Sequence, residues 1–398
     1  MTMPWIIEAR DPLIFRDGRP IGGNAPIATM DFPYPSTLAG AVRGRLASDA
    51  SGFTLTRQTG PLAELRQIPV RGPLLAEISP TGELLGWLLP APRDALVRID
   101  DGGSLSLTPL RPQPLPPGHH VDDLDKRGLD PLVPNAHLPP GKPPADPPVF
   151  WRERHYLAWL TGQVPTAVPA RDLGIGAFPR EARMHLVMKP NERVGEDGGL
   201  FETVGLRFVD TPMPGTMTQC RHYALSVACP GGTVAGKQLT MRRELAPLGG
   251  ERRLARWWPA GAAWPGPPRG LHEQILRTRR ARLLLVTPAI FDHGALPGWS
   301  GNPWPGDSLV QATVKAACVP SAQIVSGWDM ETNKPKPTRR MAASGSVYFV
   351  EVECDHDDDL RRWIDATWLQ SICDRPEDRR DGFGLAALGV WPETTSCP

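Results

Sequence analysis

The sequence has 398 residues, of which 40 % are hydrophobic, and a chain of this length favours two or three domains with large cores. Its formal net charge is only +1, whereas free-standing nucleic-acid-binding proteins usually carry a clear basic excess. No apolar run reaches the ~18–20 residues of a membrane span, and the first residues do not resemble a signal peptide. We therefore expect a globular, cytoplasmic protein that does not enter a membrane.

The charges are nevertheless segregated along the chain. Basic clusters occur at 252–256, 277–282 and 334–340, whereas 351–359 is acidic. Most basic residues are arginines, which suit bidentate phosphate contacts and stacking on bases, although the codon usage of a GC-rich genome would produce the same bias. The six cysteines lack CxxC spacing, so we expect buried, reduced thiols rather than a zinc or redox site.

A helix is expected shortly after a glycine-rich loop near the N-terminus. Ser36 can cap this helix, and apolar residues recur at every fourth position within 38–46, which places them on one face. Arg43 and Arg45 then lie nearer the exposed side.

The middle of the chain combines a hairpin with a proline-rich insertion. Two apolar runs, 74–78 and 84–89, flank the turn sequence at 79–82, which predicts a β-hairpin. Thirteen prolines follow between 109 and 148. At that density we expect no packed element, only an extended insertion that is either a mobile loop or an arm laid against a partner.

The remaining elements indicate two similar halves. We expect strands at 4–10, 184–189, 201–209, 222–228, 282–287 and 346–353, and helices at 150–160 and 358–373. The order strand, helix, strands, helix, strand occurs twice. This order predicts an α+β fold of two ferredoxin-like (RRM-like, split βαβ) domains, 1–215 and 216–398, with long irregular insertions that include 109–148.

Known catalytic signatures are missing from the sequence. It contains no phosphate loop, HExxH, GxSxG or kinase motif, and its nine histidines have no ligand spacing. The acidic segment 355–359 would suit a hard cation. It also directly precedes the helix expected at 358–373, where carboxylates cap free amides and match the helix dipole. We favour the helix-capping interpretation and expect neither a catalytic residue, a metal nor a cofactor.

Two N-terminal segments carry a family resemblance. Residues 11–20 read DPLIFRDGRP and residues 32–43 read FPYPSTLAGAVR. Together they resemble the N-terminal signature of the RAMP subunit that caps the 5′ handle of crRNA in type III-B (Cmr) CRISPR effector complexes.

Four later segments resemble the same family in the family's own order. They are EARMHL at 181–186 with GGLF at 198–201, LGGER at 248–252, GWD at 327–329 with KPKP at 334–337 and GSVYF at 345–349, and the glycine-rich segment at 382–389. The proline-rich insertion has no counterpart among these motifs.

The resemblance implies a non-catalytic binding subunit of a ribonucleoprotein. Its partners would be the 5′ handle of the crRNA, the large polymerase-like subunit, a neighbouring RAMP backbone subunit and, indirectly, the target RNA. Family members also project a hairpin thumb between guide and target, which we expect within 96–150.

We expect RNA contacts at positions that combine free backbone amides, hydroxyls, arginines and stacking side chains. A tryptophan in a glycine-flanked loop can stack on a base, and the C-terminal glycine-rich loop can cradle an RNA backbone. The candidate RNA-binding residues are Arg16, Arg19, Ser36, Thr37, Arg43, Arg45, Arg183, His185, Arg252, Trp328, Gly382 and Gly384.

Three other interpretations remain open at this stage. The chain could be a metal-independent RAMP endoribonuclease that processes guide RNA, with His185 or Tyr348 near the glycine-rich loop. It could be the equivalent handle-binding subunit of a type III-A complex. It could also be a structural adaptor that binds the large subunit without touching RNA.

Overall fold

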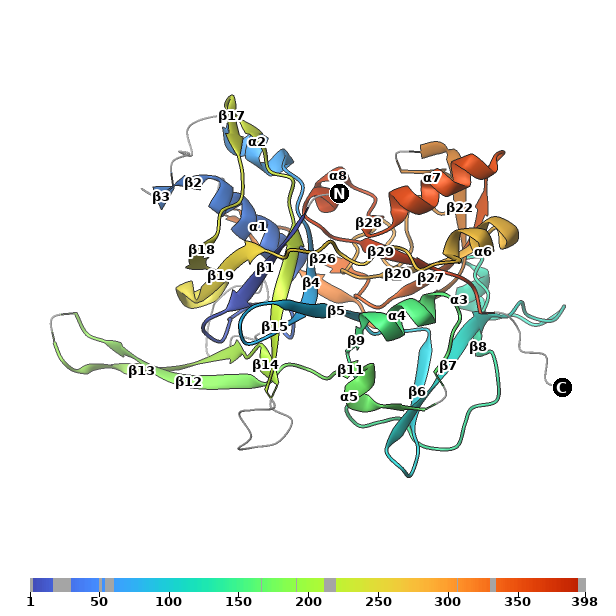
Figure 1. The fold of residues 1–398 in the computed structure, drawn as a ribbon, viewed down its shortest axis with the longest axis horizontal. Helices are drawn as coiled ribbons and strands as arrows, with labels where there is room; N and C mark the ends of the chain where they lie inside the picture. Colours follow the sequence, from blue (N-terminus) through green and yellow to red (C-terminus); the bar gives the residue numbers. More distant parts are fainter. Residues whose placement is uncertain are drawn as a thin grey trace.

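The computed structural model describes residues 3–16, 30–49, 52–53, 61–165, 167–190, 192–210, 220–305, 307–329 and 334–392. The fold is α+β, as the sequence predicts, and is dominated by two antiparallel sheets that lie side by side (Figure 1). None of the helices in these ranges has the length and hydropathy needed to cross a membrane.

The first sheet combines strands from the first two thirds of the chain. Its strand order is β11-β9-β5-β4-β15-β1-β19-β18, with β14 pairing beside β15. In that order the strands are β11 (Gly174–Ile175), β9 (Phe150–Arg152), β5 (Leu84–Pro90), β4 (Arg71–Ile78), β15 (Arg221–Ala228), β1 (Pro4–Ala9), β19 (Leu254–Pro259), β18 (Glu244–Pro247) and β14 (Val209–Asp210). Helices α1 (Pro35–Leu46) and α2 (Pro61–Gln67) accompany this sheet.

The second sheet is built from the C-terminal part of the chain. Its order is β21-β22-β27-β20-β29-β28. These strands are β21 (Asn302–Trp304), β22 (Asp307–Cys318), β27 (Val347–Glu353), β20 (Arg280–Leu285), β29 (Leu385–Gly389) and β28 (Gln370–Ser371). Its helices are α6 (Leu271–Thr278), α7 (Asp357–Thr367) and α8 (Pro376–Arg380), and α6 and α7 lie together over the sheet (Figure 1).

Both sheets share one arrangement of their four central strands. Numbered by their order along the chain, the strands lie as second, third, first and fourth: β4-β15-β1-β19 in one sheet and β22-β27-β20-β29 in the other. Helix α1 follows the first strand of the first sheet, whereas α7 follows the third strand of the second sheet. Each half therefore keeps one of the two crossover helices that the repeated pattern predicts.

Sheet membership does not change at the predicted domain boundary near residue 215. Strands β15, β18 and β19 follow that residue but pair within the first sheet. The second sheet begins only with β20 at Arg280. The sequence pattern places the strands correctly, but strand pairing between distant segments is invisible to it.

A third, smaller sheet links the two halves. It comprises β6 (Ala95–Ile99), β7 (Ser104–Pro112), β8 (Leu132–Pro134) and β10 (Val168–Pro169), and α3 (Asp122–Asp125), α4 (Glu153–Leu160) and α5 (Ala170–Leu173) lie in the same part of the chain. The hydrophobic core at the second sheet includes Trp151, Trp159 and Leu160, although these residues lie far before the strands of that sheet in the sequence. The proline-rich insertion contains β8 and α3, so the prediction that it holds no packed element is wrong.

A buried ion pair fixes this junction. Arg282 of β20 is 1 % exposed and pairs with Asp94, which is fully buried. Trp159 Nε1 donates to Asp94 Oδ1 at 3.0 Å, and Arg282 Nη2 donates to the Trp159 carbonyl at 2.7 Å. Because a buried charge without a partner is strongly destabilising, these contacts tie the linking segment to the second sheet.

Several short two-stranded ladders complete the fold. They are β2 (Ser48–Asp49) with β3 (Gly52–Phe53), β12 (Arg180–Met188) with β13 (Gly195–Leu206), β16 (Gly232–Val234) with β17 (Lys237–Leu239), β23 (Gln323–Val325) with β26 (Arg339–Met341), and β24 (Trp328–Asp329) with β25 (Lys334–Pro335). The β12–β13 ladder is a long hairpin that projects away from the body of the molecule (Figure 1).

Candidate nucleic-acid interface

Helix α1 forms where the sequence predicts it, but its start differs. Tyr34 occupies the N-cap position without a side-chain cap bond, Pro35 begins the helix, and the prediction that Ser36 caps it is wrong. Ser36 and Thr37 lie in the first turn and are half-buried. The Thr37 amide already donates to the Tyr34 carbonyl at 3.0 Å, so it is not available to an anion.

Arg43 is not on an exposed face, contrary to the prediction. Its side chain is 11 % exposed and donates to the carbonyls of Ile68 and Arg380 and to Asp381 Oδ1, the last at 2.5 Å. Arg380 and Asp381 lie at the start of the C-terminal glycine-rich loop. Arg43 therefore joins α1 to that loop across more than 330 residues of sequence.

Arg45 is also largely enclosed, so the prediction of its exposure is wrong as well. Its side chain is 10 % exposed, pairs with Glu244 and lies 5.1 Å from the ring centroid of Trp257. Burial, with a smaller contribution from Arg242, lowers the pKa of Arg45 to about 10. The guanidinium remains protonated at neutral pH and serves the packing of α1 on the first sheet.

The glycine-rich loop is packed against protein rather than open to a ligand. Gly382 has a φ of +86°, and a Cβ there would lie 2.7 Å from the Val70 carbonyl oxygen. Gly384 has a φ of +71°, and its Cβ would lie 2.6 Å from Cys373 Sγ. These glycines are required by positive φ and by close packing.

The amides of this loop are already used. Gly382 N–H donates to the Arg379 carbonyl, Phe383 N–H to the Asp378 carbonyl, and Gly384 N–H to the Pro288 carbonyl at 2.7 Å. A phosphate cradle needs free N–H groups. The bonded amides of residues 382–384 do not offer such groups, and the interpretation of this loop as an RNA-backbone cradle stays a prediction.

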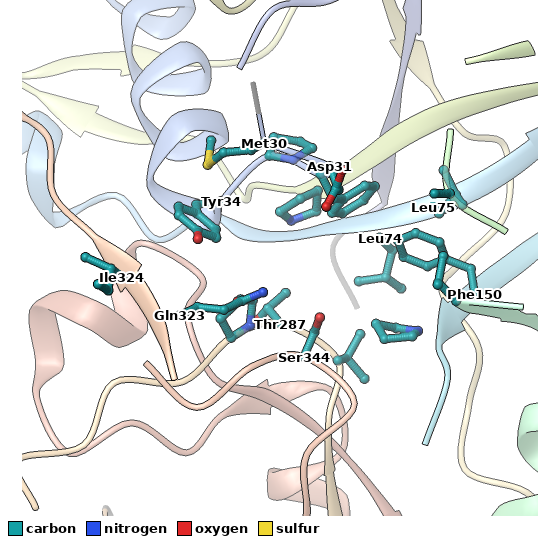
Figure 2. Close-up of a pocket in the computed structure, with 18 of the residues that line it drawn as sticks. Met30, Asp31, Tyr34, Leu74, Leu75, Phe150, Thr287, Gln323, Ile324 and Ser344 are labelled. Atoms are coloured by element: carbon teal, nitrogen blue, oxygen red, sulfur yellow. The ribbon is translucent and has the colours of Figure 1, made fainter. Parts of the chain in front are cut away.

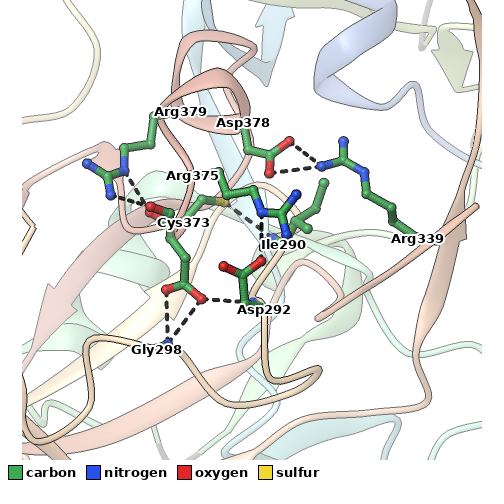
Figure 3. A network of polar contacts seen from close by, with 9 residues as sticks. Ile290, Asp292, Gly298, Arg339, Cys373, Arg375, Asp378 and Arg379 are labelled. Carbon is green, nitrogen blue, oxygen red and sulfur yellow. Dashed lines mark hydrogen bonds and ion pairs between the residues drawn. The ribbon is translucent and has the colours of Figure 1, made fainter. Parts of the chain in front are cut away.

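A polar network beneath α8 holds the same loop in place (Figure 3). Asp374 accepts the backbone N–H of Asp292 at 2.8 Å and that of Gly298 at 2.9 Å. Asp378, which is 2 % exposed, pairs with Arg339 at 2.8 and 3.0 Å. Burial raises the pKa of the Asp378 carboxyl although Arg339 lies beside it. The Asp378–Arg339 pair therefore holds two segments together more than it stabilises the ionised carboxylate.

The projecting hairpin places Arg183 and His185 in a different environment. Arg183 is 43 % exposed, and its ion-pair partner among the described residues is Glu181, at 2.6 Å from its Nε. The His185 ring stacks on Phe201 with 5.2 Å between centroids, and its Nε2 lies 2.9 Å from Thr203 Oγ1. Both predicted residues thus lie on an exposed arm.

The same hairpin exposes apolar side chains that the sequence analysis does not single out. Leu200 is 63 % exposed and Met184 59 % exposed. The other exposed apolar residues of the hairpin are Leu186, Val187, Met188, Val194 and Phe201. Such a concentration on one two-stranded arm marks an interaction surface.

Of the remaining predicted residues, Arg16 and Arg252 lie near each other, on either side of Glu251. Arg16 pairs with Glu251 at 2.7 Å, and Arg252 is exposed with a φ of +50°, next to Glu251. Trp328 belongs to β24, and Arg19 lies outside the described residues. The structure therefore does not bring the predicted residues into one site.

A cleft of about 790 Å³ lies between the two halves (Figure 2). From the first half it is lined by the segment before α1, including Phe32 and Tyr34, and by Phe150. From the second half it is lined by Thr287 and Gln323. Sequence reasoning missed this cleft, although two of its aromatic residues lie within FPYPS, a segment that it did single out.

The cleft has an aromatic wall. Phe32 and Phe150 lie 4.9 Å apart between ring centroids, and Phe150 and Phe178 lie 6.2 Å apart. Charged lining residues are few: Asp31, Arg93 and Lys336, all exposed. Asp31 pairs with Arg180.

The predicted helix-capping role of the acidic segment is supported by its position. Asp357, Asp358 and Asp359 lie in the first turn of α7, although the N-cap residue His356 makes no side-chain cap bond. The three carboxylates pair with Arg279, Arg361 and Arg362, respectively. Their position matches the helix dipole.

A family model described as "CRISPR-associated protein (Cas_Cmr3)" matches residues 5–391. The chain belongs to this family. The identification from sequence motifs as a subunit of Cmr type is confirmed. The Cas_Cmr3 match spans both sheets and the segment that holds the proline-rich insertion.

Two solved structures are similar to this member of the Cas_Cmr3 family. One is "Cryo-EM structure of the Type III-B Cmr-beta bound to cognate target RNA and AMPPnP, state 1", with 14 % identity, a TM-score of 0.44 and coverage of 87 % of this chain and 86 % of that chain. Another is "Cryo-EM structure of the Type III-B Cmr-beta bound to cognate target RNA", with 14 % identity, a TM-score of 0.46 and coverage of 97 % and 99 %. No curated protein sequence matches significantly. The assignment rests on the family model.

Proposed function

We propose that this chain is a non-catalytic crRNA-binding subunit of a type III-B CRISPR effector complex. It caps the 5′ handle of the crRNA in the cytoplasm and pairs with the large polymerase-like subunit. A neighbouring RAMP backbone subunit and, indirectly, the target RNA are its other partners. The observation that carries this proposal is the Cas_Cmr3 family match over residues 5–391, which favours the type III-B complex over its type III-A equivalent.

The proposal includes two ferredoxin-like RAMP domains. Its support is the shared second, third, first, fourth order of the four central strands in both antiparallel sheets, which is the order of a split βαβ unit. Only α1 and α7 occupy crossover positions. The two domains then present a cleft between them, which corresponds to the cavity of about 790 Å³.

The thumb that the resemblance implies is better placed on β12–β13 than within 96–150. The earlier segment forms the β6–β7 hairpin, but Leu105 and Leu107 of β7 are buried in the core of the second half. Farther along, the Asp130 amide donates to the Lys315 carbonyl at 2.6 Å. In contrast, β12–β13 projects freely and exposes apolar side chains, as a wedge between guide and target requires (Figure 1).

The nuclease alternative loses one of its two residues. Tyr348 is fully buried, its hydroxyl donates to the Ala295 carbonyl at 2.7 Å, and burial raises its pKa. It cannot reach an RNA phosphate. His185 stands on the projecting hairpin, with Thr203 as its hydrogen-bond partner, whereas the glycine-rich loop lies in the body of the second half.

Purification of the assembled complex tests the proposal. A tagged chain is isolated from its native host, the co-purifying proteins are identified and the RNA is sequenced. We expect short RNAs that share one repeat-derived 5′ end, together with a polymerase-like large subunit. Recovery of the large subunit without RNA would favour the adaptor, and metal-independent cleavage of repeat RNA by the purified chain would favour the nuclease.

A further inference from the structure

The interdomain cleft has the chemistry of a pocket for a single aromatic, hydrogen-bonding ligand. Its volume of about 790 Å³ lies within the roughly 300–1,000 Å³ typical of small-molecule sites. The rings of Phe32, Phe150 and Phe178 form one wall, and polar uncharged side chains from the second half face them across the cavity (Figure 2).

Gln323 provides an unused polar group in this cleft. It lies on β23, whose backbone is fixed by pairing with β26 in the register Gln323 to Met341. Its Oε1 atom is buried and has no hydrogen-bond partner among the described residues. A buried acceptor without a donor costs about 1–3 kcal/mol, so a rotation of this side chain that brings the amide to a ligand in the cleft gains an interaction the free protein lacks.

The charges at this cleft favour a nucleobase in its interior and phosphate groups at its rim. Among the described residues, the cations that line the cleft are Arg93 and Lys336, both exposed, and neither forms an ion pair with another described residue. Asp31 is paired with Arg180. A free phosphate would have no cation in the interior, whereas a base would meet rings and an amide, with its flanking phosphates at the two rim cations.

We infer that this cleft holds one unstacked nucleobase of the guide RNA's 5′ handle and that Gln323 reads the edge of that base. The inference rests on the proposed function. An amide presents one acceptor and one donor side by side, which complements a base edge with the opposite pair. Phe32 and Tyr34 stand before the first turn of α1, so the sequence segment FPYPS forms part of the wall.

The test uses the assembled complex and guide RNAs that carry 2-aminopurine or an abasic site at successive handle positions. We expect one position where removal of the base weakens binding about tenfold and where the fluorescence of 2-aminopurine changes on binding. Gln323→Met, which keeps the length of the side chain but removes the amide, should abolish base preference at that position. Gln323→Glu, which only accepts, should keep bases with an exocyclic amine and reject keto bases.

Gln113→Met serves as the control, because Gln113 is exposed and does not line the cleft. Normal binding of every abasic RNA, or unchanged base preference in both Gln323 variants, would overturn the inference while leaving the proposed function intact. Absence of guide RNA from the wild-type complex would instead contradict the proposed function itself.

Discussion

The glycine-rich loop and the β12–β13 hairpin were both candidates for RNA contact, yet they have opposite environments. The backbone amides of residues 381–384 are hydrogen-bonded within the chain. A Cβ added to Gly382 would lie within 2.8 Å of the carbonyl oxygens of Val70 and Gly72. Around Gly198, in the irregular part of β13 between its pairs with Met188 and Leu186, no atom lies within 4 Å of an added Cβ, although its φ is also positive at +72°. The same residue type thus stabilises packing in one region and accommodates an open strand irregularity in the other.

The largest expected effect separates these two glycines. Gly382→Ala should lower the free energy of unfolding by at least about 2 kcal/mol, because positive φ and a clash with Val70 and Gly72 act together. Gly198→Ala should cost about 1 kcal/mol or less. Urea unfolding of both variants measures the difference, and equal losses would show that the loop is not packed as described.

A second comparison contrasts two arginines. Arg43→Met should destabilise the protein by about 2 kcal/mol, because the carbonyls of Ile68 and Arg380 and the carboxylate of Asp381 lose their donor. Arg183→Met, on the hairpin, should change stability by no more than about 0.5 kcal/mol. Thermal unfolding of both variants gives the comparison. Arg43 would be an RNA ligand rather than a packing residue if its variant folded normally but lost guide RNA.

On the hairpin, the exposed apolar side chains should contribute to RNA binding and not to the stability of the fold. Leu200→Ser with Phe201→Ser should leave the melting temperature nearly unchanged and weaken target RNA binding by the complex about tenfold, the loss expected for one stacking contact. Leu85→Ser is the matched control, since Leu85 is an exposed leucine, at 62 %, on β5 of the first sheet. Equal effects of the two variants would remove the hairpin from the interface.

The smallest effect concerns a thiol beneath the glycine-rich loop. Cys373 is fully buried, and burial raises its pKa to about 12, so roughly one thiol in 10⁴ is ionised at pH 8. Iodoacetamide should therefore leave Cys373 unmodified in the folded chain and label it in urea, as peptide mass spectrometry would show. With rising pH the thiolate fraction increases and reaches one half at about pH 12. Rapid labelling at pH 8 would mean that the loop opens.

Local sequence patterns predicted the helices and strands whose hydrophobic periodicity lies within one short segment. The strand at 4–10, the β4–β5 hairpin and α1 all form close to their expected bounds. Helix α7 is the exception, because its C-terminal end comes earlier than predicted. It stops at Thr367 because Trp368 leaves the helical region and Leu369 adopts a φ of +50°, although the apolar periodicity continues to Trp368.

Contacts between distant segments could not be predicted from one sequence. Arg43 lies on an exposed face only if α1 is considered alone; Asp381, 338 residues later, encloses it. The interdomain cleft likewise combines the segment 30–34 with 322–326. Motif resemblance identified the family correctly, yet it could not separate residues that bind RNA from residues that hold the two sheets together.

Crosslinking within the native ribonucleoprotein tests the central claim, that the guide RNA contacts the cleft and the hairpin rather than the glycine-rich loop. The complex is irradiated, digested, and its RNA-linked peptides are identified by mass spectrometry. The account predicts crosslinks in peptides that contain Phe32 and Tyr34 and in those from 180–206. Crosslinks confined to 376–389, with none in the cleft or the hairpin, would contradict it.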